Sequence, residues 1–286
     1  MTYSKIKRIA VLGAGTMGHG IAHASMAAGY QTALYDLSPQ ILDQARTTIS
    51  TIVQKSVELG KVPQAEADGI LGRLTSSTTL ADAVGGADMV IEAIPEKIEL
   101  KLSTFAAVQV HAPAAAVLAT NTSALSITEI AAVLDDPGRL AGMHFFNPVH
   151  RMKLVEIVRA LESREETLDT IDEVARRMGK ETVLVRESPG FVTSRINVLI
   201  GNEAFYMLQE GVASARDIDK AIKLGLNHPM GPFELVDLVG LDTRLSILQY
   251  LHRTLGEKFR PCPLLEQYVR AGRLGKKVGR GVYDYS

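Results

Sequence analysis

Two polar side chains fall where the surrounding sequence is apolar. His144 lies in the run Leu140–Phe146, and Glu156 lies in the run Leu154–Val158. Burying an unpaired carboxylate costs several kcal/mol, so Glu156 is expected to have a partner. The loop between the two runs contains Asn147-Pro148 and allows the imidazole and the carboxylate to meet. A carboxylate fixes the tautomer of a neighbouring imidazole and stabilises its protonated form, so the pair can act as a general base.

A structural interpretation of the same pair stays open, because buried ion pairs also occur where no chemistry takes place. The nucleotide-binding loop described next favours catalysis, since a hydride can leave a carbinol carbon only if the hydroxyl proton is also removed. Two other histidines, His19 and His23, have the four-residue spacing of a helical metal pair. No nearby Asp, Glu or Cys completes a ligand set, so we expect no metal site.

A glycine-rich loop near the N-terminus is typical of dinucleotide binding. The apolar run Ile9–Leu12 leads into Gly13-Ala14-Gly15-Thr16-Met17-Gly18, and a helix of small residues follows. The first glycine permits a tight turn, and the second lets backbone N–H groups approach a pyrophosphate. The third lets the helix pack closely on the sheet. Because the motif lies between a predicted strand and a predicted helix, we expect all six residues to contact the cofactor.

Asp36 determines which dinucleotide fits. It ends the next predicted strand, 23 residues after Gly13, where a carboxylate accepts hydrogen bonds from both hydroxyls of the adenosine ribose. The carboxylate would repel a 2′-phosphate, and Leu37-Ser38 offer no arginine to bind one. The predicted cofactor is therefore NAD rather than NADP. The alternative is an ordinary strand–helix turn in which Asp36 only caps a helix.

Apolar runs that could form strands alternate with amphipathic segments over the first two thirds of the chain. Most of these runs are apolar nearly throughout, as expected for strands covered on both faces. The alternation predicts an α/β fold, a doubly wound parallel sheet of the Rossmann type, with helices at 39–59 and 96–111. The predicted strands are Ile6–Leu12, Gln31–Tyr35, Asp88–Ile94, Ala116–Thr120, Arg139–Phe146, Lys153–Arg159 and Thr182–Arg186.

The strand pattern stops after about Glu187, and only helices are predicted beyond it. We therefore expect an NAD-binding domain over residues 1–187 and an all-α domain over residues 188–286, joined near Ser188-Pro189-Gly190. The helical signals are the segment Phe191–Gln209 closed by Gly211, a capping box from Ser214 to Asp217 on a helix ending at Gly225, Pro232 in a first turn, and Asp242 capping Thr243–Leu255.

The composition excludes several classes of protein. The 286 residues carry 31 Lys and Arg against 32 Asp and Glu, so no net charge attracts nucleic acid or an anionic membrane. No apolar run approaches the ~18 residues that cross a bilayer. The single cysteine, Cys262, cannot form an intramolecular disulfide, and the apolar run at Ile9 begins too early to follow a signal or transit peptide. We expect a cytoplasmic protein.

The motifs together resemble those of the short-chain L-3-hydroxyacyl-CoA dehydrogenases, in particular the bacterial 3-hydroxybutyryl-CoA dehydrogenases. The resemblance runs essentially from one end of the chain to the other. It rests on the glycine loop and on the segments Glu92–Glu96, Asn121–Ser123, His144–Val149, Lys153–Glu156, Pro189–Phe191, His228–Pro232 and Gly275–Tyr283.

The resemblance implies roles for individual residues. His144 would be the catalytic base that Glu156 orients, and Ser123 and Asn147 would lie beside the nicotinamide and the reacting end of an acyl-CoA substrate. The reaction would interconvert (S)-3-hydroxyacyl-CoA and 3-oxoacyl-CoA, best on short chains. Further residues implied to contact the NAD ribose, neighbouring cofactor groups or the nicotinamide end are Glu96, Lys101 and Lys277. The resemblance also implies that the helical domain closes over the acyl group and forms the interface of a homodimer.

Two parts of the predicted substrate site fit the family pattern less well. Many relatives carry Asn-Arg shortly after Pro-Gly-Phe, and their Asn helps bind substrate; here Ser194 holds that position, with Asn197 one helical turn later as the alternative. The family's CoA-binding lysines follow the second strand, where Lys55 and Lys61 are candidates. Taken alone, either lysine reads as a solvated charge on a helix face, and Lys101 taken alone also reads as solvated.

Two other functions compete with this one. The first is a dehydrogenase of similar architecture that acts on a sugar acid, such as an L-gulonate dehydrogenase. The second is a non-catalytic NAD-binding structural protein, against which the intact His144–Glu156 pair argues.

Overall fold

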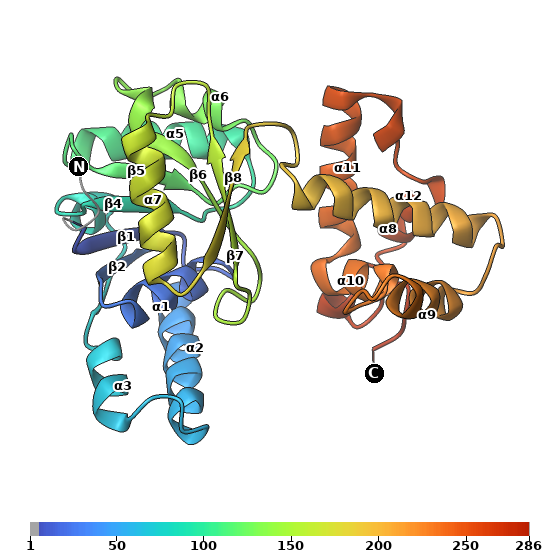
Figure 1. The fold of residues 1–286 in the computed structure, drawn as a ribbon, viewed down its shortest axis with the longest axis horizontal. Coiled ribbons are helices and arrows are strands. Elements are labelled where there is room, and N and C mark those ends of the chain that lie inside the picture. Colours follow the sequence, from blue (N-terminus) through green and yellow to red (C-terminus); the bar gives the residue numbers. More distant parts are fainter. Residues whose placement is uncertain (1–5, 286) are drawn as a thin grey trace. The chain divides into compact units, whose positions relative to one another are not determined.

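The computed structural model describes residues 6–285, and its contacts divide the chain into two compact units. One unit ends at Glu187 and the other begins at Ser188 (Figure 1). The first consists of a sheet with helices and the second of helices alone. Each unit has its own hydrophobic core.

The first unit is built on one eight-stranded sheet with the order β3-β2-β1-β4-β5-β6-β7-β8. Every neighbouring pair is parallel except β6 and β7, which are antiparallel. The strands are β1 (Arg8–Leu12), β2 (Gln31–Tyr35), β3 (Leu74–Ser77), β4 (Met89–Glu92), β5 (Val117–Thr120), β6 (Leu140–Phe145), β7 (Leu154–Arg159) and β8 (Glu181–Arg186).

Two features of the sheet were not predicted correctly. The edge strand β3 was missed, because its sequence Leu-Thr-Ser-Ser has no apolar run and its side chains are only partly buried. The sheet is also not wholly parallel, since β7 runs against β6. The connection between those strands, residues 146–153, contains no helix and is shorter than the dozen or so residues that a parallel crossover requires.

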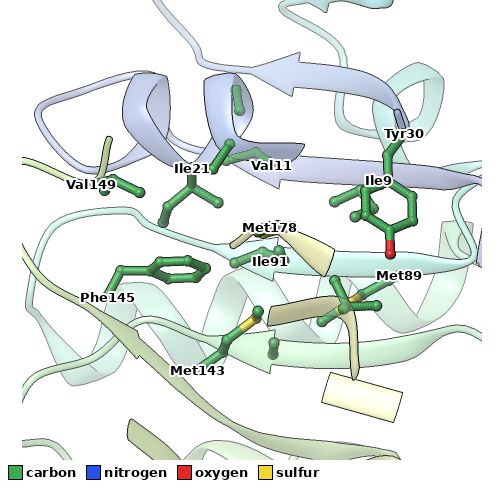
Figure 2. Packing of buried hydrophobic residues seen from close by; sticks show 14 of the residues in the cluster. Ile9, Val11, Ile21, Tyr30, Met89, Ile91, Met143, Phe145, Val149 and Met178 are labelled. Carbon is green, nitrogen blue, oxygen red and sulfur yellow. The ribbon is translucent and has the colours of Figure 1, made fainter. Parts of the chain in front are cut away.

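The main core lies on the face of the sheet that contacts α1 (Gly18–Ala27) and α7 (Glu165–Arg177). Figure 2 shows Ile21 of α1 together with Phe145 and Met143 of β6 in this core. The first unit also contains α2 (Pro39–Glu58), α3 (Gln64–Leu71), α4 (Leu80–Val84), α5 (Ile98–His111), α6 (Ile127–Ala131) and the 3-10 turn η2 (Pro137–Arg139).

The second unit packs its helices around a separate apolar cluster in which the Phe205 and Phe233 rings meet edge to face at 5.2 Å. Asp242 was predicted as an N-cap, but α11 already begins at Leu241, and Asp242 lies within its first turn. The elements are α8 (Thr193–Gln209), α9 (Ala215–Gly225), α10 (Pro232–Val239), α11 (Leu241–Leu255), η3 (Glu257–Phe259), α12 (Pro263–Arg270) and η4 (Lys276–Val278).

Two other helix starts in this unit follow their sequence signals closely. Ser214 Oγ accepts a hydrogen bond from the Asp217 N–H at 3.2 Å, and Pro232 is the first residue of α10.

Within residues 6–285, no helix has both the length and the apolar character needed to cross a membrane.

Candidate active site

The glycine loop needs glycine at its first and third positions because other backbone atoms approach closely. Gly13 has φ of +92°, and a Cβ there would lie 2.7 Å from the Ala93 carbonyl oxygen. A Cβ on Gly18 would lie 1.6 Å from the Gly13 carbonyl oxygen, whereas the nearest sheet side-chain atom, on Val11, is 3.8 Å away. The third glycine therefore lets α1 approach the loop itself more than the sheet. Nothing lies within 4 Å of a Cβ on Gly15, which leaves room for a ligand against the backbone.

Asp36 is held against the glycine loop. Its Oδ2 accepts from the Ala14 N–H at 2.9 Å, and its Oδ1 accepts from the Ser38 N–H at 3.0 Å. The N-cap of α2 is Ser38, whose Oγ accepts from the Ile41 N–H. The alternative in which Asp36 caps the helix is therefore wrong.

A pocket of about 510 Å³ opens between the glycine loop and the end of β4. This volume is within the usual range for small-molecule sites. Asp36 supplies the carboxylate at its edge, and the loop supplies backbone groups. The apolar wall comes from Leu37, Ile41, Ala93, Ile94, Pro95 and Leu100, with Thr16 and Met17 of the loop also lining the pocket. The apolar wall, the carboxylate and the open backbone at Gly15 fit the adenosine half of a dinucleotide.

His144 and Glu156 meet as predicted. They are register partners in the antiparallel pair β6 and β7, so both side chains project from the same face of the sheet. His144 Nδ1 and Glu156 Oε2 are 2.8 Å apart, and the two residues are 4% and 0% exposed. A proton on Nδ1 satisfies the carboxylate, and this tautomer makes Nε2 the basic nitrogen. The geometry is that of an oriented general base.

Lys101, which the resemblance placed beside the cofactor and which taken alone reads as solvated, is buried. It is 1% exposed, and its Nζ lies 2.6 Å from Glu92 Oε1 and 3.4 Å from Glu96 Oε2. A charged amine at this depth needs such partners, because removing it from water without them is costly. Glu92 is fully buried at the end of β4. Burial raises the pKa of the Glu92 carboxyl above its usual value, and the charge of Lys101 and the hydrogen bonds to the carboxylate offset only part of this rise.

Glu96 and Ser123 are brought together. Glu96 Oε1 accepts from the Ser123 N–H at 2.7 Å and from Thr122 Oγ1 at 2.6 Å. Asn121 lies in the same loop after β5, and its Oδ1 accepts from the Phe145 N–H at 2.8 Å, one residue after His144. The loop that carries Ser123 is thus attached both to Glu96 and to the strand of the base.

Sequence reasoning did not assign a role to Glu92 or to its contacts with Thr120. The signal was present, because Glu92, like Glu156, is a carboxylate in an apolar run, although Glu92 ends its strand and Glu156 lies inside its own. Asn147 is exposed in the connection between β6 and β7, with a cis peptide bond to Pro148. Lys55 and Lys61 are exposed at the end of α2 and in the following turn.

The two histidines on α1, His19 and His23, contact other groups of the first unit. His19 Nδ1 lies 2.9 Å from the Gly15 carbonyl oxygen, and the ring of His23 lies edge-on to His150 at 6.4 Å. Burial lowers the pKa of His23 to about 4, and the nearby positive charges of His150, Lys180 and His19 add to this effect. Across the described part of the chain, no three His, Cys, Asp or Glu side chains are grouped to hold a metal ion.

The remaining predicted residues lie in the helical unit. Ser194 is in the first turn of α8. Asn197 contacts the 95%-buried Arg244: in the amide orientation that satisfies the oxygen and the nitrogen of Asn197, its oxygen accepts from Arg244 Nη2 at 3.0 Å. Lys277 Nζ is 2.7 Å from both carboxylate oxygens of Asp242.

Comparison with known protein families identifies the family to which the chain belongs. Residues 8–188 match the family model described as the NAD binding domain of 3-hydroxyacyl-CoA dehydrogenase, and residues 190–285 match the model of its C-terminal domain. The chain belongs to the 3-hydroxyacyl-CoA dehydrogenase family. This 3-hydroxyacyl-CoA dehydrogenase family member is an NAD-dependent oxidoreductase, which confirms the family, fold class and cofactor predicted from the sequence.

Several relatives of this dehydrogenase match over nearly their whole length. A probable 3-hydroxybutyryl-CoA dehydrogenase of Bacillus subtilis is 47% identical over 282 residues, which is 98% of each chain. The 3-hydroxybutyryl-CoA dehydrogenase of Clostridioides difficile is 41% identical over 98% of this chain and 99% of its own. The crystal structure of an (S)-3-hydroxybutyryl-CoA dehydrogenase from Ralstonia eutropha aligns with a TM-score of 0.94 and 39% identity, covering 99% of this chain and 100% of that one.

Proposed function

We propose that this dehydrogenase interconverts (S)-3-hydroxybutyryl-CoA and acetoacetyl-CoA. The observation that carries the proposal is the buried His144–Glu156 contact of 2.8 Å. It occurs in a chain similar to 3-hydroxybutyryl-CoA dehydrogenases over nearly its full length. Such a pair is suited to remove or return the proton of a hydroxyl group on a carbon that exchanges hydride.

The chain's own residues would handle the proton and the orientation of the substrate. His144 Nε2 takes the proton of the 3-hydroxyl group, and the Glu156 carboxylate stabilises the imidazolium that results. In the reverse direction the protonated imidazole polarises the 3-oxo group and returns the proton. Ser123 and Asn147 hold the reacting end of the substrate against His144. When bound, NAD supplies the hydride acceptor or donor.

The cofactor would be held mainly by the first unit. Backbone N–H groups of the loop Gly13–Gly18 face the pyrophosphate, and the Asp36 carboxylate accepts from the hydroxyls of the adenosine ribose. Glu96, Asn147 and Ser123 would contact the part of the cofactor toward the nicotinamide, and Lys277 of the helical unit would approach the same end. Lys101 acts there through Glu96, since its amine is already held by two carboxylates.

The helical unit would complete the enzyme. In this proposal it closes over the acyl group, Ser194 donates to an oxygen of the acyl-CoA, and the unit forms the interface of a cytoplasmic homodimer. Lys55 and Lys61 would meet the phosphates of CoA. Asn197 is a weaker candidate for the substrate contact than Ser194, because its carboxamide is committed to Arg244.

Family membership leaves the acyl group open. The 3-hydroxyadipyl-CoA dehydrogenase of Escherichia coli is 39% identical over 98% of this chain, which covers 59% of that protein. We favour the butyryl substrate because the relatives with higher identity over their full length are named for it. Family membership argues against the non-catalytic NAD-binding protein, and the sugar-acid dehydrogenase is the alternative that the assay below addresses.

The test is NADH consumption by the purified full-length chain. Wild type should oxidise NADH rapidly with acetoacetyl-CoA as substrate. It should oxidise NADH only slowly with 3-oxoadipyl-CoA or with the keto acid of L-gulonate. The matched control is His144→Gln, which keeps a polar side chain but removes the base. Activity confined to the sugar acid would replace the proposal with the first alternative. NADH binding without turnover of any substrate would favour the second.

A further inference from the structure

We propose that Glu92 is a positioning residue of this dehydrogenase: it is the hub that fixes the Ser123 loop relative to the strand of His144. The proposal rests on the proposed function, because it concerns the geometry of that same site. It also gives Lys101 a different role, that of connecting two carboxylates.

Glu92 has partners on both carboxylate oxygens although it is fully buried. Oε1 accepts from Lys101 Nζ at 2.6 Å and from the Ile94 N–H at 2.8 Å. Oε2 accepts from Thr120 Oγ1 at 2.6 Å. Contacts of this length to a charged acceptor are strong and directional. They tie the end of β4 to the end of β5 and to the first turns of α5.

One arm of the network runs through Lys101 to the cofactor side. Lys101 Nζ lies 3.4 Å from Glu96 Oε2, so a single buried amine faces two carboxylates. The other oxygen of Glu96 accepts from Thr122 Oγ1 and from the Ser123 N–H. Because Glu96 is itself about 40% exposed, its position depends on these contacts rather than on packing. Glu92 therefore sets the position of Glu96 through Lys101.

The second arm runs through the backbone to the base. The Glu92 carbonyl accepts from the Asn121 N–H at 2.8 Å. The Asn121 side chain accepts in turn from the N–H of Phe145, the residue after His144. Since β4, β5 and β6 are parallel neighbours, this network joins their carboxyl ends, the edge at which α/β sheets bind ligands.

Stability alone does not explain such a hub. A buried ion pair can often be replaced by packed apolar side chains without loss of stability, whereas removing one partner leaves an uncompensated charge. Charged groups with defined directions instead fix where their partners lie, which a catalytic loop requires. The side-chain arm ends on Ser123, so an error at the Glu92 carboxylate would be transmitted to that loop. The backbone arm, which does not depend on the side chain at position 92, ties the same loop to the strand of His144.

The experiment compares Glu92→Gln with Asp172→Asn in the full-length protein. Asp172 is the control carboxylate: it is partly exposed on α7, binds Arg176 and Thr182, and belongs to neither arm. Both variants should lower the melting temperature. Only Glu92→Gln should weaken NADH binding, which fluorescence titration measures, and lower kcat with acetoacetyl-CoA. We expect each quantity to change by about tenfold, the effect of roughly one strong contact. If both variants leave NADH binding and kcat within about twofold of wild type, the proposal is wrong.

A gentler pair of variants covers the case in which Glu92→Gln does not fold. Thr120→Val removes one hydroxyl donor to Glu92 and keeps the ion pair, and Thr120→Ser restores the donor. We expect Thr120→Val to lower kcat severalfold with KM for acetoacetyl-CoA unchanged, and Thr120→Ser to recover it. Equal kcat for Thr120→Val and wild type would overturn the proposal. NADH titration needs no acyl substrate, so it tests Glu92 even if wild type fails to use acetoacetyl-CoA.

Discussion

At the residue scale, the 2.8 Å contact between His144 and Glu156 predicts that the two side chains act as one functional unit. His144→Gln should lower kcat by about 10²–10⁴, the usual contribution of a positioned base, and leave NADH affinity nearly unchanged. Glu156→Gln should lower kcat as well, because the imidazole loses the group that fixes its tautomer. The double variant should lose less than the product of the single effects. Steady-state kinetics of the four proteins check this, and multiplicative losses would argue against a coupled pair.

Asp36 is expected to exclude NADPH. Its carboxylate already accepts the Ala14 N–H and lies at the edge of the pocket, so a 2′-phosphate there would meet a negative charge. Asp36→Ala should weaken NADH binding and narrow the preference for NADH over NADPH. Titration of both dinucleotides against both proteins measures this. Comparable use of NADPH by wild type would contradict the role given to Asp36.

His23 should make the first unit sensitive to acid. Burial lowers its pKa from 6.5 to about 4, so between these values the unfolded chain holds a proton that the folded chain does not. Stability contributed by neutral His23 is therefore complete above pH 6.5 and is lost as the pH falls toward 4. His23→Leu should reduce the loss between pH 7.5 and 5 by about 2 kcal/mol. Urea denaturation at both pH values checks this, with His111→Leu at an exposed site as the control. An equal pH dependence in His23→Leu and wild type would contradict it.

Residues with one strong local signal could be predicted, and those that depend on distant partners could not. Glu156 was paired correctly because a carboxylate in an apolar strand demands a partner. The resemblance placed Lys101 beside the cofactor, but its burial could not be predicted, because its partner Glu92 lies on a different element and nothing local shows that the amine turns inward. Asn197 gave no sign of its contact with Arg244, which lies on another helix.

At the element scale, the first turns of α8 carry two side chains to which we give different roles. Ser194 is the proposed substrate contact, and Asn197 is a structural contact to Arg244. Ser194→Ala should lower kcat/KM for acetoacetyl-CoA by about 0.5–1.5 kcal/mol, one neutral hydrogen bond, without changing NADH binding. Asn197→Ala should instead lower the melting temperature, because the buried Arg244 loses its partner. Kinetics and thermal melts of both variants decide between them. A large kinetic loss confined to Asn197→Ala would transfer the substrate contact to Asn197.

Apolar periodicity predicted most of the elements, and what it missed has physical reasons. Helices with caps or prolines began where expected, as at Ser214 and Pro232. The strand β3 carries polar side chains on an edge that is only partly covered, so it has no apolar run to reveal it. The direction of β7 depends on the connection before it rather than on its own sequence.

At the scale of the whole molecule, the two units should be separable. The core cluster of the first unit contains no residue beyond Met178, and that of the second begins at Val198. The His144–Glu156 pair, the glycine loop and Asp36 all lie in the first unit. The chain therefore keeps its cofactor pocket and its base on one folding unit and adds the second for substrate closure and dimerisation in our proposal.

A fragment of residues 1–187 tests this division. It should melt cooperatively, because its core is complete without the helices. It should bind NADH with less than a tenfold loss of affinity, about 1.4 kcal/mol, since the pocket is lined only by residues of this unit. It should not turn over acetoacetyl-CoA, because Ser194 and the proposed closing surface are missing. It should sediment as a monomer, whereas we expect the full chain to sediment as a dimer. A soluble fragment that turns over acetoacetyl-CoA would contradict the role of the helical unit. A folded fragment that does not bind NADH would place essential cofactor contacts in the helical unit. In that case Lys277→Ala in the full chain is the variant to examine next.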